Sequence, residues 1–156
     1  DHLGTGNGCI LPDWSRTGAH LRGAAARCHS GGRREDKLTA LVQELRGKGA
    51  EVHVIPMDLS LKKSPRALFR TVRDLGVHVD ALVNNAEITY HGPFTDMNTS
   101  VVMDMAQLNV TALAALTHQF VQPIIAAGEG RILNVSSVTA FQPAPGLANQ
   151  MTTLWV

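Results

Sequence analysis

The sequence predicts an α/β fold built on a doubly wound parallel sheet. Short apolar or β-branched runs alternate with longer segments of helical periodicity, and small polar residues follow each run. Strands that alternate with helices at this spacing pair in parallel through crossover helices that cover both faces of the sheet. A chain of 156 residues with 44% apolar composition is enough for one domain with a buried core.

The first regular elements are expected only after residue 32. In residues 1–32, glycine, arginine, histidine and alanine are scattered without a period of two or 3.6, so we expect no helix or strand there. Apolar residues spaced by three and four predict an amphipathic helix over 38–45, which Gly47 would end. The β-branched run 52–55 is closed by a proline and predicts a strand.

Two further strands and two helices are expected in the rest of the chain. Ser64 is expected to cap a helix whose first residue is the following proline. Strands are expected at 81–83 and 132–135, because both runs are short and apolar. Between them, residues 99–127 predict a long helix, which Pro123 should kink or shorten.

Composition excludes several classes of function. A formal net charge of +1 gives no electrostatic footprint for nucleic acid or anionic lipid. We expect no membrane span, because no apolar run approaches about 18–20 residues, and no secretory signal at the first residues. Two cysteines cannot make a disulfide framework, which favours a cytoplasmic location. Histidine and cysteine spacing fits no zinc site, so we expect no metal.

Small polar side chains follow all three expected strands. Asp58 follows the first strand, Asn84 and Asn85 the second, and Ser136 and Ser137 the third. Parallel strands end at one edge of a sheet, and such sheets bind ligands beyond that edge. Each of these residues alone could simply terminate a strand or cap a helix. Polar residues after all three strands in succession favour a crevice that binds a ligand.

Two segments here resemble motifs of the short-chain dehydrogenase/reductase family. The run ALVNNAE, residues 81–87, looks like the N-N-A-G motif at the end of a strand, with Glu87 in place of the glycine. The run MDLS looks like the segment whose acidic residue meets the adenine ring of the cofactor, which places Asp58 in that role. The resemblance implies cofactor contacts at Asp58, Leu59, Asn84, Asn85 and Ala86.

Two more segments resemble the catalytic part of the family. LNVTAL supplies Asn109, which matches the asparagine of the catalytic group, and GRILNVSSVTAFQPAPG resembles the strand that ends in the catalytic serine, here Ser137. In an intact relative, Ser137 would hydrogen-bond the substrate carbonyl and Asn109 would hold the backbone and water relay. The family has a Rossmann-like sheet and reduces carbonyls or oxidises alcohols with NAD(H) or NADP(H). We therefore expect residues 33–156 to form a partial domain of this kind.

Basic residues favour one of the two cofactors. RREDKL resembles the segment after the family's second strand, where members that prefer NAD carry an acidic residue for the ribose 2′-hydroxyl. Arg33 and Arg34 suit a 2′-phosphate instead, so we expect NADP(H) rather than NAD(H). The alternative is that both arginines lie on the solvated first turn of a helix.

The active-site tyrosine and lysine of the family are missing. The positions expected for them hold Gln150 and Leu154, and the chain's one tyrosine, Tyr90, lies too early in the sequence to replace the lost one. The tyrosine donates the proton that the carbonyl oxygen needs, and a positioned acid typically contributes about 10²–10⁴ in rate. We therefore expect little or no turnover of a carbonyl or alcohol substrate.

The N-terminal segment also departs from the family. The stretch 4–8 is rich in glycine, but Cys9 stands where a dinucleotide fingerprint needs its third glycine, so we expect a flexible terminus. Shifting the possible codons of 27–32 by one nucleotide permits Gly-Ala-Thr-Leu-Val-Val, the family's second strand. An out-of-frame reading of 1–32 is therefore one hypothesis.

Three other interpretations stay open. The chain is a non-catalytic remnant that binds a nucleotide or a partner, with the helix around Asn109 as the surface for a homo-oligomer. It is a degenerate gene product without function. Or it is an unrelated flavodoxin-like binding domain.

Overall fold

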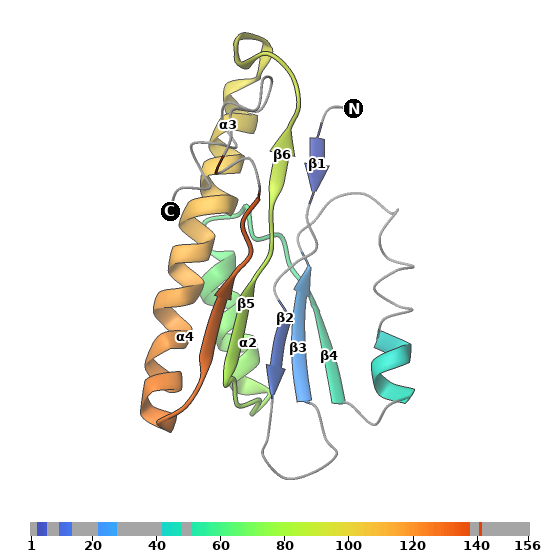
Figure 1. The fold of residues 1–156 in the computed structure, drawn as a ribbon, viewed down its shortest axis with the longest axis vertical. Coiled ribbons are helices and arrows are strands. Elements are labelled where there is room, and N and C mark those ends of the chain that lie inside the picture. Colours follow the sequence, from blue (N-terminus) through green and yellow to red (C-terminus); the bar gives the residue numbers. More distant parts are fainter. Residues whose placement is uncertain are drawn as a thin grey trace.

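A five-stranded sheet forms the centre of the computed structural model (Figure 1), which describes residues 3–5, 10–13, 22–27, 42–47, 51–137 and 141. The strands lie in the order β4-β3-β2-β5-β7. Their bounds are β2 Ile10–Asp13, β3 Arg22–Arg27, β4 Glu51–Pro56, β5 Ala81–Asn84 and β7 Arg131–Asn134.

Four of the five strands run in the same direction, which confirms the doubly wound α/β class. Strand β3 pairs in parallel with β4, and β5 pairs in parallel with β7. The central strand β2 runs antiparallel to both of its neighbours. The expectation of a wholly parallel sheet is therefore wrong for this strand. Only residues 14–21 separate β2 from β3, and a parallel connection needs a dozen residues or more.

Strands also form where the sequence pattern predicts none. Besides β2 and β3, residues Leu3–Thr5 form β1, which pairs antiparallel with β6, Ile88–Tyr90. The expectation of no regular element in 1–32 is therefore wrong. The sequence of β3, RGAAAR, has little intrinsic preference for a strand, and its pairing with two neighbours determines its conformation.

Two helices cover one face of the sheet and form the core with it. They are α2, Ser64–Asp74, and α4, Leu113–Ala127, which pack against each other. In Figure 1, α2 lies behind β5 and α4 lies to the left of β7. Phe69 and Phe120 meet edge to face at their contact, with ring centroids 5.1 Å apart. The buried residues shared by helices and strands include Leu59, Leu68, Val72, Leu82, Leu108, Leu116, Phe120 and Ile124. A short helix over 42–47 lies beyond β4.

The start of α2 differs from the expected cap. Lys63 is the N-cap residue and has no side-chain hydrogen bond to the helix, whereas Ser64 is the first helical residue. The Ser64 backbone N–H donates to the carbonyl of Leu61 at 2.9 Å, so the preceding turn already supplies a partner for it. Ser64 is buried, which leaves its hydroxyl in the core contact rather than over the helix end.

The expected long helix is continuous but contains a wider turn. It begins with α3, Thr99–Ala106, capped by the Asn98 side chain, which accepts from the N–H of Ser100 at 2.9 Å. A π-helical segment, Gln107–Ala112, joins α3 to α4. Pro123 lies inside α4 and does not shorten it, because Phe120 and Ile124 on either side are anchored in the core. Turns of the π type occur often at functional sites.

The helix Thr99–Ala127 is long and apolar enough to cross a membrane by length and composition alone. Its most apolar 18-residue window has a mean hydropathy of 1.3, and 22% of that window is buried. The expectation that no segment reaches this length is therefore wrong. The finding is weak support for a membrane span, because core helices pass the same test, and Leu116 and Phe120 of this helix lie in the core.

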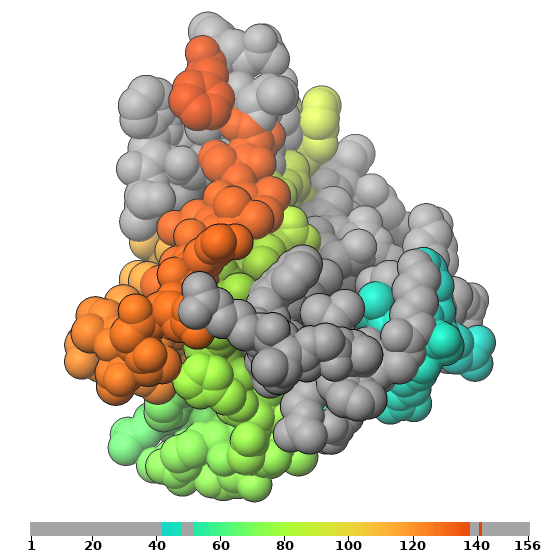
Figure 2. All heavy atoms as spheres, turned by 60° about the horizontal axis from the view of Figure 1, so that its bottom comes forward, coloured from blue at the N-terminus to red at the C-terminus, as the bar shows by residue number. Residues whose placement is uncertain are grey.

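Strand β7 is the last strand of the described sheet and is open to solvent. Leu133 and Val135 are 56% and 48% exposed. Figure 2 shows the atoms of β7 and the residues after it, in red-orange, at the surface of the molecule.

Candidate functional site

The three segments with expected site residues leave the sheet at one edge. Because β4, β5 and β7 run in the same direction, Asp58, Asn85 and Ser137 all follow strands that end at the top of Figure 1. Strands β4 and β5 are not neighbours, since β3 and β2 lie between them. A ligand that touches both must therefore bridge the intervening strand ends.

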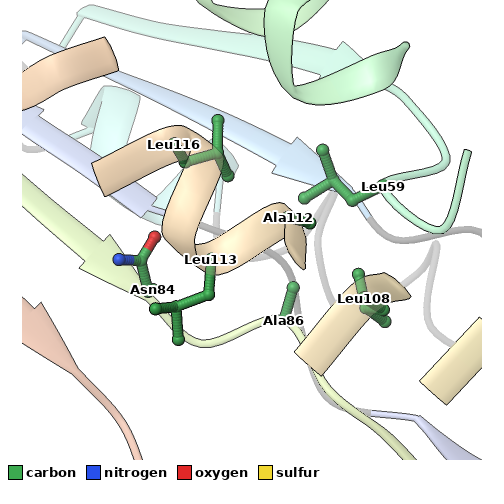
Figure 3. Close-up of a pocket in the computed structure, with 7 residues that line it drawn as sticks. All are labelled: Leu59, Asn84, Ala86, Leu108, Ala112, Leu113 and Leu116. Carbon is green, nitrogen blue, oxygen red and sulfur yellow. The ribbon is translucent and has the colours of Figure 1, made fainter. Parts of the chain in front are cut away.

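The loops after β4 and β5 nevertheless meet at one pocket. Leu59 from the first loop lies there with Asn84 and Ala86 from the second, and α4 with the π-helical segment closes the other side (Figure 3). The remaining lining residues are Leu108, Ala112, Leu113 and Leu116. The space inside the pocket is about 10 Å³, which is room for a single water. The pocket is therefore a small gap in the packing below the strand ends and is too small for a flat ring system.

Asp58 shapes the loop beside this pocket. Its Oδ1 accepts hydrogen bonds from the Ser60 N–H at 2.9 Å and the Ser60 hydroxyl at 2.7 Å. The two bonds form an Asx turn, which fixes the path of the chain from β4 into the loop. Leu59, between these two residues, is 0% exposed and packs in the core.

Asn84 is bound inside the protein rather than facing the crevice. Its side-chain amide donates to the Thr117 hydroxyl at 3.0 Å and to Oδ1 of Asn134 at 2.9 Å. The residue is 3% exposed. Both hydrogens of its amide are therefore used between β5, β7 and α4, and none is left to donate to a cofactor. Asn85, the next residue, is half-buried at the strand end.

Asn109 pairs with the backbone of the loop after β5. Its Oδ1 accepts from the N–H of Ile88, and its Nδ2 donates to the carbonyl of Ile88, both at 3.0 Å. It lies in the π-helical segment and is 6% exposed. Asn109 thus makes the same pair of hydrogen bonds to Ile88 that the backbone of a neighbouring strand would make. The pair holds the start of β6 against the helix.

Ser137 and Glu87 lie at the same edge with different surroundings. Ser137 is half-buried and is the third residue beyond the end of β7. Glu87 is half-buried too, and its Oε1 accepts from the hydroxyl of Thr89 at 2.9 Å. The carboxylate in the position of the family's glycine therefore has a partner within its own loop.

Several expected site residues lie outside the described part of the chain. They are Arg33 and Arg34, Cys9 of the glycine-rich stretch, and Gln150 and Leu154. Among the residues that the structure does describe, no three histidine, cysteine or acidic side chains group in a way that could hold a metal ion.

Thr117 and Asn134 are site-edge residues that the sequence pattern did not single out. Asn134 is the register partner of Asn84 in the parallel pair β5–β7, and each is the last residue of its strand. Thr117 had no local signal, since a threonine in a helix faces the sheet only through tertiary packing.

Comparison with known proteins gives close and consistent matches. A family model described as short chain dehydrogenase matches residues 17–151. Nodulation protein G of Rhizobium sp. (strain N33) is 35% identical over 130 residues, which are 83% of this chain and 51% of that protein. A 3-oxoacyl-(acyl-carrier-protein) reductase of Aquifex aeolicus (strain VF5) is 30% identical over 119 residues, 76% of this chain and 48% of that protein.

A solved structure shows the same arrangement. A metagenomic short-chain oxidoreductase in complex with NADP superposes with a TM-score of 0.73 and 27% identity, covering 85% of this chain and 58% of that chain. The chain spans about half the length of the curated relatives it matches. The family model matches most of the chain and the fold superposes on a solved member, so the chain belongs to the short-chain dehydrogenase/reductase family.

Proposed function

We propose that this chain carries the cofactor-binding part of an NADP(H)-dependent oxidoreductase that reduces a carbonyl or oxidises an alcohol. The observation that carries the proposal is the match of residues 17–151 to the short-chain dehydrogenase family model, together with the exit of β4, β5 and β7 at one edge of the sheet. A dinucleotide lies across strand ends in this way in doubly wound folds.

The described residues fit the adenine end of such a cofactor. Asp58 follows β4 at this edge of the sheet, and its carboxylate can accept a hydrogen bond from an amino group on the edge of the adenine ring. The Asx turn at Asp58 and the Asn109–Ile88 pair fix the two loops before any ligand arrives. Pre-formed loops lower the entropy cost of binding.

NADP(H) is favoured over NAD(H) by charge. Arg33 and Arg34 can pair with a 2′-phosphate through forked, charge-assisted hydrogen bonds. The metagenomic relative was solved with NADP. When bound, the cofactor supplies or accepts the hydride, and the chain's own groups must orient the substrate and move its proton.

The substrate end of the site is incomplete. In this proposal, Ser137, which is half-buried beyond the end of β7, hydrogen-bonds a substrate oxygen, and Asn109 holds the start of β6 through Ile88. The proton donor is missing, because Gln150 has no proton to give near neutral pH and Leu154 has no charge. We therefore expect cofactor binding with little or no turnover.

The test is a fluorescence titration with NADPH, followed by a turnover assay with a panel of ketones and aldehydes. We expect NADPH to bind more tightly than NADH, and no oxidation of NADPH. The double variant Gln150→Tyr with Leu154→Lys restores the missing groups and is expected to gain turnover. Oxidation of NADPH by the unaltered chain would refute the expectation that the chain lacks a proton donor. If neither nucleotide binds, the proposed function is refuted.

A second candidate function is a binding remnant that assembles with a copy of itself through the helix Thr99–Ala127. The observation that favours it is the exposure of two large apolar side chains, Met103 at 62% and Ile125 at 66%. Such side chains often mark interfaces when they gather on one surface. Light scattering with Met103→Lys and Ile125→Lys tests it: a dimer that these variants convert to monomer supports it.

We keep a reducing cytoplasm as the proposed location, because the chain has only two cysteines.

We also retain the division at residue 32 as a proposal. The central strand of the sheet comes from the N-terminal side of this division, runs opposite to its neighbours and contains Pro12. A proline is uncommon in a central strand, because it cannot donate to the ladder. An N-terminal segment read out of frame would explain both features.

A further inference from the structure

We propose that Thr117 is a positioning residue, which acts through Asn84 to hold the carboxyl ends of β5 and β7 together. This inference rests on the proposed function, because those two strand ends carry Asn85 and Ser137 toward the cofactor and the substrate. Thr117 itself touches neither ligand in this scheme, and it is separated from both by the strand end.

A backbone bond and a side-chain bond link the carboxyl ends of β5 and β7. The N–H of Val135 donates to the carbonyl of Asn84 at 2.9 Å, and the amide of Asn84 donates to Oδ1 of Asn134 at 2.9 Å. Both bonds lie where the two strands approach the site.

Thr117 fixes the orientation of the amide that makes the side-chain bond. The second hydrogen of Asn84 Nδ2 goes to the Thr117 hydroxyl at 3.0 Å. Thr117 lies on α4, on the side that faces the sheet, and Figure 3 shows Asn84 beneath the turn that carries Leu113 and Leu116. With the hydroxyl in place, both hydrogens of the buried amide have acceptors.

Removing the hydroxyl leaves a buried donor without an acceptor. Valine has nearly the shape of threonine, so Thr117→Val keeps the packing and removes only the acceptor. The Asn84 amide can then rotate away from Asn134 to find another partner, and the strand ends open locally. The amino ends of the same strands have their own link, because the N–H of Arg131 donates to the carbonyl of Asp80 at 2.7 Å.

Amide hydrogen exchange tests the positioning role without any ligand. In Thr117→Val we expect exchange at Val135 to speed up by about tenfold, and exchange at Arg131 to stay as it is. Thr117→Ser keeps the hydroxyl and is expected to restore the slow exchange. The matched control is Thr111→Val, which makes the same chemical change at an exposed position of the same helix.

NADPH titration at low temperature, where all variants are folded, tests the consequence for the site. We expect Thr117→Val to bind about tenfold more weakly, and Thr117→Ser and Thr111→Val to bind as the unaltered chain does. Unchanged exchange at Val135, or an equal rise at Val135 and Arg131, would overturn the inference, because the second result indicates a general loss of stability. If the unaltered chain binds no NADPH, the proposed function fails, and the exchange rates still decide the role of Thr117.

Discussion

Replacing Asn109 by alanine removes two hydrogen bonds at once and tests how the π-helical segment holds the site. In the structure, the Asn109 amide satisfies both the N–H and the carbonyl of Ile88, each at 3.0 Å. Ile88 packs against the core, so water reaches its backbone poorly.

The magnitude follows from the two groups left without a partner. An unsatisfied buried donor or acceptor costs about 1–3 kcal/mol. Because Ile88 is half-buried, we take the lower part of that range for each group, and expect a loss of about 2–3 kcal/mol in the free energy of unfolding. This is a large share of the roughly 5–15 kcal/mol that stabilises a typical domain.

Urea-induced unfolding followed by circular dichroism measures the loss. Asn109→Asp serves as the half-way variant, because it keeps the acceptor for the Ile88 N–H and loses the donor to the Ile88 carbonyl. Thr111→Ala, two residues along and exposed, is the control and should stay within about 0.5 kcal/mol of the unaltered chain. The reasoning is refuted if Asn109→Ala also stays within that margin, since the two bonds would then contribute nothing net.

Further predictions concern the sheet, the pocket loop and the gene. Gly130→Ala should destabilise the fold by about 1–3 kcal/mol, because a Cβ there would clash with Ile124 Cγ2 and lie 2.7 Å from the carbonyl oxygen of Asp80; an unchanged melting temperature would contradict this. Asp58→Ala should weaken NADPH binding about tenfold by releasing the turn at Ser60, with Asp58→Asn, which keeps an acceptor oxygen, closer to normal. Translation of the DNA for the N-terminal segment in a frame shifted by one nucleotide should give the sequence of a glycine-rich turn and a helix. A shifted translation without that turn would rule out the hypothesis that residues 1–32 are read out of frame.

Local patterns predicted the elements that have strong periodicity and their own end signals. Strands at 52–55, 81–83 and 132–135 were each found within about one residue, and the helix over 99–127 was found at its full length. These segments bury one consistent face, so the pattern of apolar residues alone determines their structure. The edge where Asp58, Asn85 and Ser137 emerge also followed from the parallel direction of their strands.

The N-terminal strands and the inner bonds of the site could not be predicted in this way. The segments that form β1 and β3 have no period of their own and become strands by pairing with β6 and β4. The role of Asn84 also changed: the motif suggested a contact with the cofactor, whereas its amide bonds to Thr117 and Asn134 within the protein. No local pattern shows that a residue of a helix lies opposite a strand end.

The sequence by itself determined the family and most of the helices and strands after residue 50, because motif spacing and apolar periodicity are read along the chain. Only the tertiary structure shows which polar groups meet: Asn109 bonds to the backbone of Ile88, and Asn84 bonds to the hydroxyl of Thr117. It also shows that the central strand runs antiparallel to its neighbours. These outcomes depend on contacts between residues far apart in sequence. Buried donors and acceptors must find partners wherever the packing brings them.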